Sequence, residues 1–499
     1  MFLYGTKKKY RMKKLIVSLF SLITVLTVQS QERNIEFEEY DLDNGMHVIL
    51  HEDNSTPIVA VSIMYHVGSK NENPERTGFA HFFEHLMFEG SRYIDRGEFD
   101  EYVESNGGTL NANTSQDRTY YYEILPSNQL ELGLWLESER LLHAKVEQIG
   151  IDTQREVVKE EKRQRVDNQP YGSFMAEMAD QLFDEHPYEW TPIGYMEHLD
   201  AAEEADYVNF YQTFYVPSNA TLSIAGDIDI EESKKMIANY FGTIPKGQAI
   251  NLYRDFLNLE EEEFKTKYGK DKSIFNEDNF FSESSSEGKA LIAEYAAKEV
   301  KIPRPSIKEP ALEKEIIDTV YDNIQLPGLF LGYHAPAQNS EDAYAMDMLN
   351  TILSGGSSSR LNKSIVEDKE LAVSAFSFAF SLEDPGMALV AGIAAKDVDV
   401  DSLKMALDAE IKKVQTELVS EEEFQKVKNQ FENNFYSSSS SVAGKAESLA
   451  NNYVYFNNTN LINEELKKYD NITREDLKRV ANKYFTKDAR VVMYYLPKK

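Results

Sequence analysis

Two histidines and a glutamate stand close together in the segment His81-Phe82-Phe83-Glu84-His85. Histidines four residues apart project from one face of a helix, and neutral imidazoles are good zinc ligands. Glu84 lies between them on the same side. A carboxylate there could take a proton from a metal-bound water and pass it to a leaving amine. The segment therefore predicts His81 and His85 as zinc ligands and Glu84 as a general base.

The alternative interpretation is a helix that carries two surface histidines without a metal. A chain of this composition would show the pattern by chance roughly 0.02 times, which makes it a specific signal. The helix is also expected to be buried, because large apolar residues surround the motif. These residues are Phe79, Phe82, Phe83, Leu86 and Phe88.

The composition narrows the chemistry further. The chain has 499 residues and no cysteine, so disulfides, thiolate zinc sites and a cysteine nucleophile are excluded. A transition metal must be held by His, Asp or Glu. The formal net charge of −31 disfavours nucleic acid as a partner. Such a surface could favour basic peptides, although a surface that only confers solubility is the simpler interpretation.

The N-terminus resembles an export signal. A basic stretch precedes the apolar segment Leu15 to Val28, which is too short for a comfortable membrane span. Cleavage after Ser30 would make Gln31 the first mature residue, and Met12 is an alternative start. We expect an exported protein, periplasmic or secreted, with no stable membrane span after cleavage. The alternative is an uncleaved anchor.

The chain contains two similar halves. In the first, strands at 58–66, 119–125 and 220–225 alternate with helices at 79–89, 130–142 and 207–215. In the second, strands at 329–334, 387–393 and 490–496 alternate with helices at 342–353, 401–417 and 477–485. This order predicts an α+β protein with two similar α/β-sandwich domains, each an antiparallel sheet with helices packed on it.

The predicted boundaries follow from these patterns. Residues 1–30 are the signal peptide, 31–249 the zinc-binding domain and 313–499 the second domain. Residues 250–312 contain a run of four glutamates from Glu260 and a Ser/Glu-rich stretch, with prolines near the end. We expect a linker with an acidic insertion that is helical around 288–300. A functional lid is the alternative to a solvated insertion.

Longer motifs add a family resemblance. The segments 77–91 and 107–112, together with His186-Pro187-Tyr188 and Phe214-Tyr215-Val216-Pro217, resemble the pitrilysin/insulinase family of zinc peptidases (peptidase family M16). That family carries the inverzincin motif His-x-x-Glu-His and includes the mitochondrial processing peptidases. The resemblance implies a zinc-dependent endopeptidase that hydrolyses extended peptides in a closed chamber. It also implies that the two domains form half of a clamshell.

The resemblance supplies a third metal ligand. The family has a glutamate about 76 residues after the second histidine, in an Arg-Glu-x-Val-x-x-Glu context. The segment 155–161 has this pattern and places the ligand on Glu161, with Glu160 as the competitor. The two would point about 100° apart on a helix, so only one can serve. An acidic residue that the family often has seven positions earlier is replaced here by Gln154.

The resemblance also suggests substrate contacts. The segment 107–114 resembles the family's edge strand, which can pair with an extended peptide through backbone hydrogen bonds. This points to Asn111 and Ala112 as substrate-binding residues. From the sequence alone, a glycine-rich turn before a core strand is an equal interpretation.

One departure from the family bears on assembly. Members that act alone carry an Arg and, seven residues later, a Tyr after a Gly-Gly-x-Ser-Ser-Arg-Leu stretch. That stretch is present at 355–361, but the expected positions hold Val366 and Val373. The chain therefore resembles the zinc-bearing subunit of a dimer, with a related chain that supplies the Arg/Tyr pair. A homodimer that manages without the pair is the alternative. The competing function is a non-catalytic peptide-binding or assembly subunit.

Overall fold

Alternating apolar residues form strand β3 (Ile58–Tyr65) in the middle of a six-stranded sheet with the order β1-β2-β6-β3-β5-β4. The computed structural model describes residues 34–277, 279–438 and 440–498. The predicted signal peptide lies outside these residues. Phe37–Lys499 form one unit, and residues 34–36, in the other, have no regular secondary structure. No helix in the described part of the chain is long and apolar enough to cross a membrane.

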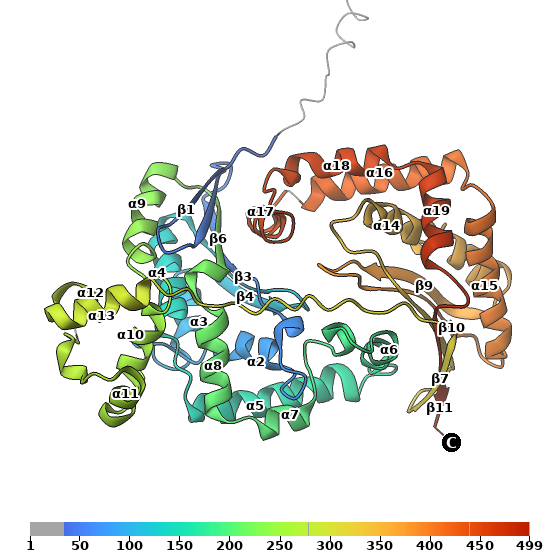
Figure 1. The fold of residues 1–499 in the computed structure, drawn as a ribbon. Helices are drawn as coiled ribbons and strands as arrows, with labels where there is room; N and C mark the ends of the chain where they lie inside the picture. The colour runs from blue at the N-terminus through green and yellow to red at the C-terminus, as the bar shows by residue number, and fades with distance from the viewer. Residues whose placement is uncertain (1–33, 278, 439, 499) are drawn as a thin grey trace, which may run out of the picture. The chain divides into compact units, whose positions relative to one another are not determined.

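The first half consists of the six-stranded sheet and the helices around it (Figure 1). Besides β3, its strands are β1 (Glu38–Asp41), β2 (His47–Glu52), β4 (Thr109–Thr114), β5 (Thr119–Pro126) and β6 (Ala220–Gly226). Its helices are α2 (Phe79–Leu86), α3 (Glu98–Ser105), α4 (Leu130–His143), α5 (Gln148–Lys162), α6 (Phe174–Leu182), α7 (Met196–Ala201), α8 (Glu204–Phe214) and α9 (Ile230–Tyr240).

The second half repeats the arrangement with a five-stranded sheet in the order β7-β11-β8-β10-β9. Its strands are β7 (Ile316–Asp322), β8 (Gly328–His334), β9 (Ala372–Phe380), β10 (Met387–Ala394) and β11 (Val491–Pro497). Its helices are α14 (Glu341–Ser354), α15 (Val400–Thr416), α16 (Glu421–Ser438), α17 (Val442–Phe456), α18 (Leu461–Asn471) and α19 (Arg474–Tyr484). The prediction of two similar domains with helices on a sheet is confirmed.

The sheets differ from the prediction in one respect, because neither is wholly antiparallel. Strand β2 pairs in parallel with β6, and β7 pairs in parallel with β11, while the other neighbours are antiparallel. In each half an early strand thus lies beside the last strand. The helix predicted at 79–89 is also shorter, because the chain turns after Leu86 and Gly90 adopts a left-handed φ of 108°.

Residues 250–312 differ from the predicted linker. The boundary at 249/250 falls inside helix α10 (Ala249–Asn258), which α11 (Glu261–Tyr268), α12 (Phe280–Glu283) and α13 (Ser286–Ala296) follow. These helices share an apolar cluster that includes Tyr253, Phe256, Phe264, Phe275 and Phe280. The segment is therefore a small helical module with its own core. Only the stretch from 299 to 315 is an extended connection, visible as the long thin segment in Figure 1.

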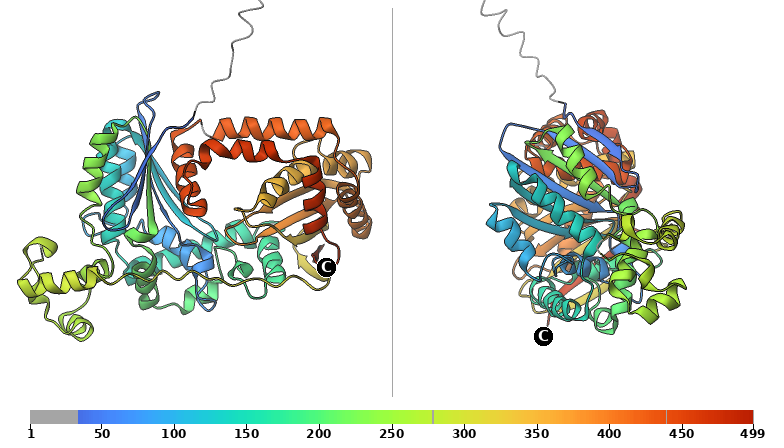
Figure 2. Two further views of the ribbon diagram at one scale, coloured as in Figure 1. Left: turned by 45° about the horizontal axis from the view of Figure 1, so that its top comes forward. Right: turned by 90° about the vertical axis from the view of Figure 1, so that its left-hand side faces the viewer.

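The two halves exchange helices. Helix α17 of the second half packs on the first sheet, where Ala60 and Ala225 contact Val442 and Ala446 (Figure 2). Ala60 and Ala225, which face α17, are small, although Met64 of β3 also packs against Ala450 of α17; the alternate residues of the two strands face the first core. This explains why β6 is buried along its whole length.

Helix α6 of the first half packs in turn on the second sheet. Met178 lies against Gly332 so closely that a Cβ added at Gly332 would be 2.1 Å from its sulfur. Leu182 packs in the same cluster as Phe330 and Leu389. Each sheet is thus covered on one face by a helix from the other half, which sequence periodicity did not predict.

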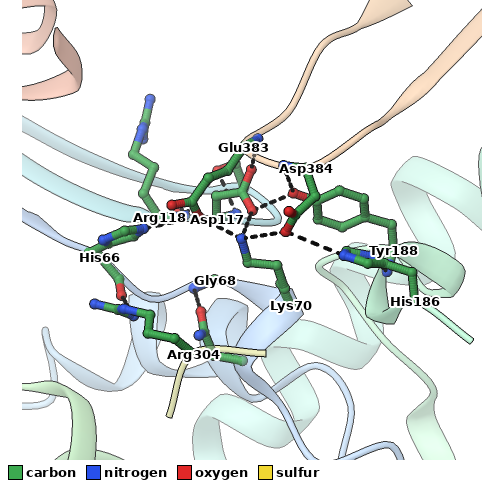
Figure 3. Close-up of polar contacts among 12 residues, drawn as sticks. His66, Gly68, Lys70, Asp117, Arg118, His186, Tyr188, Arg304, Glu383 and Asp384 are labelled. Carbon is green, nitrogen blue, oxygen red and sulfur yellow. Dashed lines mark hydrogen bonds and ion pairs between the residues drawn. The ribbon is translucent and has the colours of Figure 1, made fainter. Parts of the chain in front are cut away.

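A buried ion cluster joins the halves at their junction (Figure 3). The Nζ atom of Lys70, a residue only 3% exposed, lies 3.0 Å from Asp117, 2.5 Å from Glu383 and 3.2 Å from Asp384. Tyr188 donates a hydrogen bond to Asp117 at 2.7 Å. Removal of one partner from such a cluster leaves buried charge uncompensated, so these contacts tie the loop at 383–384 to the first half.

Candidate metal centre

Helix α2 is fixed in the first core by its aromatic face. Phe79 stacks on Tyr207 with ring centroids 4.7 Å apart, and Phe83 stacks on Phe210 at 4.9 Å. Phe82 and Phe83 are fully buried, and burial of each contributes about 1.5–3 kcal/mol. Because these residues point into the core, the opposite face of the helix turns the histidines outward.

The N-terminus of α2 is held by a carboxylate from the preceding loop. Glu72 accepts hydrogen bonds from the backbone N–H groups of Gly78 at 2.9 Å and Ala80 at 2.7 Å, and from the indole of Trp190 at 3.0 Å. Burial raises the pKa of Glu72 to about 8, although the three donors favour its charged form. Gly194 approaches so closely that a Cβ there would lie 2.3 Å from the Gly78 nitrogen. The predicted His81 and His85 are thus placed by contacts outside the motif.

Three side chains converge at this face of α2. The Nε2 atoms of His81 and His85 are 3.3 Å apart, and Oε2 of Glu161 lies 3.5 Å from the first and 3.1 Å from the second. Zinc bonds of 2.0–2.1 Å in a tetrahedron separate ligand atoms by about 3.4 Å. Two imidazoles and a carboxylate at these spacings fit Zn²⁺. They form the single group of three or more such side chains suited to a metal in the described part of the chain.

Glu161 comes from helix α5. Hydrogen bonds with His81 and then His85 hold the pKa of the Glu161 carboxyl well below its usual range, so it is a carboxylate at neutral pH. Its other oxygen pairs with Arg165 at 2.7 Å. The competitor Glu160 is exposed and pairs with Arg163 at 2.5 Å. The helical phase therefore turns Glu161, and not Glu160, toward the histidines.

Glu84 is partly buried and lies at the same face of α2. Its Oε2 accepts a hydrogen bond of 2.6 Å from the hydroxyl of Thr114, the last residue of β4. This bond holds the carboxylate at the cavity through one of its two oxygens. Thr114 was not predicted, and the sequence signal for it is only its place at the end of the edge strand.

The position seven residues before Glu161 holds Gln154 and no acidic residue. Nδ1 of His81 is buried and has no hydrogen-bond partner among the described residues. The Gln154 side chain instead donates to the buried carboxylate of Glu89, which also pairs with Arg96. Metal-bound histidines usually donate their second N–H to an acceptor, and no protein group provides one to His81 here.

The cluster opens into a cavity of about 830 Å³. Asn111 and Ala112 line it from β4, which is the outer strand of the first sheet. β4 pairs with β5 on one side, so its other side can accept an extended chain. The side-chain oxygen of Asn111 accepts a hydrogen bond of 2.9 Å from the N–H of Ala112. The structure thus brings all six predicted site residues to one cavity.

The two valines of the second half lie elsewhere. Val366 is partly buried against the second core, and Val373 is 54% exposed on the edge strand β9. Neither lines the cavity of the metal centre. Neither side chain can donate a hydrogen bond.

Comparison with known families gives two matched regions. Residues 47–189 match the family model described as insulinase (peptidase family M16), and residues 203–431 match the one described as the peptidase M16 inactive domain. The first match contains the three clustered side chains and Glu84. The second contains a single histidine, His334.

Individual relatives extend over nearly the whole chain. The zinc protease PqqE of Helicobacter pylori (strain ATCC 700392 / 26695) is 28% identical over 496 residues, which is 98% of this chain and 99% of that protein. The crystal structure of a protease from Helicobacter pylori matches with a TM-score of 0.78 and 27% identity, over 93% of this chain and 100% of that one. The periplasmic protease PqqL from Escherichia coli shares the fold, with a TM-score of 0.67, 20% identity and coverage of 92% of this chain and 47% of that one.

Proposed function

The chain belongs to the insulinase family, peptidase family M16, and we propose that it is a zinc-dependent endopeptidase that hydrolyses extended peptides. The observation that carries the proposal is the convergence of His81, His85 and Glu161 beside Glu84. All four side chains face one cavity. Relatives that are named zinc proteases support zinc as the metal.

His81, His85 and Glu161 would hold the zinc ion and leave one position open. Zinc in such a site supplies Lewis-acid chemistry toward water and a peptide carbonyl. Glu84 would take a proton from the attacking water and return it to the leaving amine. Its hydrogen bond to Thr114 keeps the carboxylate in place for both transfers.

The substrate would bind as an added strand along β4. Backbone hydrogen bonds give affinity with little dependence on side chains. The N–H of Ala112 donates a hydrogen bond to the Asn111 side chain, so an incoming peptide would have to replace this bond. We place Asn111 and Ala112 in the substrate-binding site for this reason.

The proposal includes a partner and a location. Val366 and Val373 leave this chain without the hydrogen-bond donors that family members acting alone carry. We therefore propose that it acts as a dimer, either with a related chain that carries an Arg/Tyr pair or with a second copy of itself. The match to the PqqL structure covers 92% of this chain and 47% of that one, and in this proposal a second chain would complete the chamber. The predicted signal peptide and the periplasmic PqqL support export to the periplasm or beyond.

A non-catalytic subunit is the second candidate, and the two valines favour it. The test uses the chain from Gln31 onward, zinc analysis, and quenched-fluorescent peptides of about ten residues. The Glu84→Gln protein should retain zinc and lose cleavage. A metal chelator should abolish cleavage by the wild-type chain. Glu160→Gln, an exposed carboxylate on α5, is the matched control and should cleave normally. Bound zinc without cleavage, alone and with related chains added, would favour the non-catalytic subunit.

A further inference from the structure

Four residues, 115–118, connect β4 to β5 and follow directly on Thr114, whose hydroxyl holds Glu84. We call them the hairpin turn. The N–H of Ser115 donates a hydrogen bond of 2.9 Å to the carbonyl oxygen of Arg118, so the turn is closed within itself. Asp117 in this turn is nevertheless only 1% exposed, although loops ordinarily face solvent. The contacts that bury Asp117 therefore also restrain the end of β4.

Three donors surround the Asp117 carboxylate (Figure 3). Lys70 lies 3.0 Å from it and Tyr188 donates a hydrogen bond of 2.7 Å, and both belong to the first half. The third donor is the backbone N–H of Glu383, at 3.0 Å, in the loop 381–386 between β9 and β10 of the second half. A buried carboxylate depends on such donors. The second half thus supplies part of what holds the turn.

The loop 381–386 is itself fixed to the first half. Glu383 pairs with His66 at 3.1 Å and with Lys70 at 2.5 Å. Burial alone would raise the pKa of Glu383, but His66 and Lys70 lower it to about 2, so the group is a carboxylate at neutral pH. Asp384 pairs with His186 at 3.3 Å. The backbone N–H that reaches the turn is therefore held in place by ion pairs.

A second element of the second half contacts the turn. Arg118 pairs with Glu447 of α17 at 2.7 Å, and it also donates a hydrogen bond to the side-chain oxygen of Asn113 on β4. The Arg118 side chain is 12% exposed, so this pair is screened less by water than an ion pair on the open surface. The loop 381–386 and helix α17 together hold the turn from the second half.

The restraint matters because of where β4 lies. β4 is the outer strand of its sheet and has a ladder partner, β5, on one side, so its last residue depends on the turn more than a residue of a central strand would. We propose that the second half of the chain positions the general base Glu84. Glu383 and Glu447 hold the hairpin turn, and the turn holds Thr114 against that base. Neither of these two carboxylates lines the metal cavity, so both are positioning residues, and the inference rests on the proposed peptidase function.

The test asks whether the two carboxylates act through Thr114. Glu383→Gln and Glu447→Gln keep the size of the side chain and remove its charge. Each should lower kcat about threefold to tenfold, with KM changed less than about twofold and zinc content unchanged. In the Thr114→Val protein the same substitutions should lower kcat less than about 1.5-fold, because the bond through which they act is already absent.

Glu423→Gln is the matched control. Glu423 of α16 pairs with Arg360 at 2.8 Å within the second half, and its side chain is 33% exposed against 29% for Glu383. Its substitution should lower the melting temperature, as the other two do, and leave kcat unchanged. Thermal melts establish that each variant is folded, and two positioning variants guard against the loss of one.

Hydrogen exchange measures the turn without cleavage. Amide exchange of peptides that cover residues 109–120 should be faster in Glu383→Gln and in Glu447→Gln, by about threefold or more, and unchanged in Glu423→Gln. A loss of stability without a looser turn would speed exchange in all three variants.

Three results would overturn the inference: wild-type kcat in both variants, the same fall in kcat with and without the Thr114 hydroxyl, or unchanged exchange at 109–120. If the wild-type chain cleaves peptides in any of these cases, the peptidase proposal stands without the positioning role. A zinc-loaded wild-type chain that cleaves nothing, alone or with related chains, defeats the peptidase. Faster exchange confined to the two variants then still supports the hold on the turn, and unchanged exchange overturns it.

Discussion

The hydrogen bond between Thr114 and Glu84 gives a direct test of how β4 serves the chemistry. In Thr114→Val the shape of the side chain is nearly kept and the 2.6 Å bond to Oε2 is lost. A hydrogen bond to a charged group contributes about 1.5–3 kcal/mol. If the bond holds Glu84 in its reactive orientation, its loss should lower kcat about tenfold to hundredfold.

The Michaelis constant should change little. The backbone of β4 pairs with β5 in the same register whichever side chain stands at 114, since Thr114 lies opposite Thr119 at the end of the ladder. The ligands of the metal are not altered, so zinc content should be unchanged. A fall in kcat at constant KM identifies an interaction that acts on the chemical step.

The assay is steady-state cleavage of one quenched-fluorescent peptide, with zinc measured in each sample. Thr153→Val on α5 is the matched control, because its hydroxyl bonds only to its own helix at Ile149. It should retain wild-type kcat. A Thr114→Val protein with wild-type kcat would refute the positioning argument, and so would an equal fall in both variants.

Two further predictions concern stability. Gln154→Glu should lower the melting temperature and bring no gain in zinc affinity, because it places a carboxylate against the buried Glu89. The control is Gln148→Glu, an exposed position beside Asp152, which should change the melting temperature little. Tighter zinc binding by the Gln154→Glu protein would contradict this prediction. Burial raises the pKa of Asp342, but Lys483 and Arg479 lower it to about 2. Asp342→Asn should therefore cost about 1 kcal/mol, allowing for solvent screening, at pH 7 in urea unfolding, with the difference lost between pH 4 and 2. A pH-independent difference would exclude this origin.

Local patterns predicted the parts of the fold that local forces determine. The strands β3, β5, β8 and β10 lie close to the predicted segments, because their apolar alternation reports a buried face. The spacing of His81 and His85 survives in the structure because it is a property of one helix. Helical periodicity alone did not distinguish Glu160 from Glu161, because both lie on the same helix. The family motif was needed to choose Glu161.

The remaining features depend on contacts that no local pattern reports. Strand β4 reads Thr-Leu-Asn-Ala-Asn-Thr, a polar segment that becomes a strand because β5 pairs with it. Glu72 reaches the start of α2 from a loop, and its sequence neighbours do not distinguish it from the exposed Glu75. The helical module at 250–296 was not predicted, because its run of glutamates suggested a solvated linker. The aromatic residues that form its core lie on both sides of that run.

The exchange of helices limits how a substrate could enter. Opening between the two sheets would separate α17 from β3 and β6, detach α6 from β8 and break the pairs of Lys70 with Glu383 and Asp384. Opening would leave the buried Lys70 with Asp117 as its remaining partner and would take Glu383 and Asp384 away from it, which is unfavourable. A movement within this chain is therefore a costly way to admit a peptide. Admission through a face closed by a second chain breaks none of these contacts, and this favours the proposed dimer over a chain that opens and closes by itself.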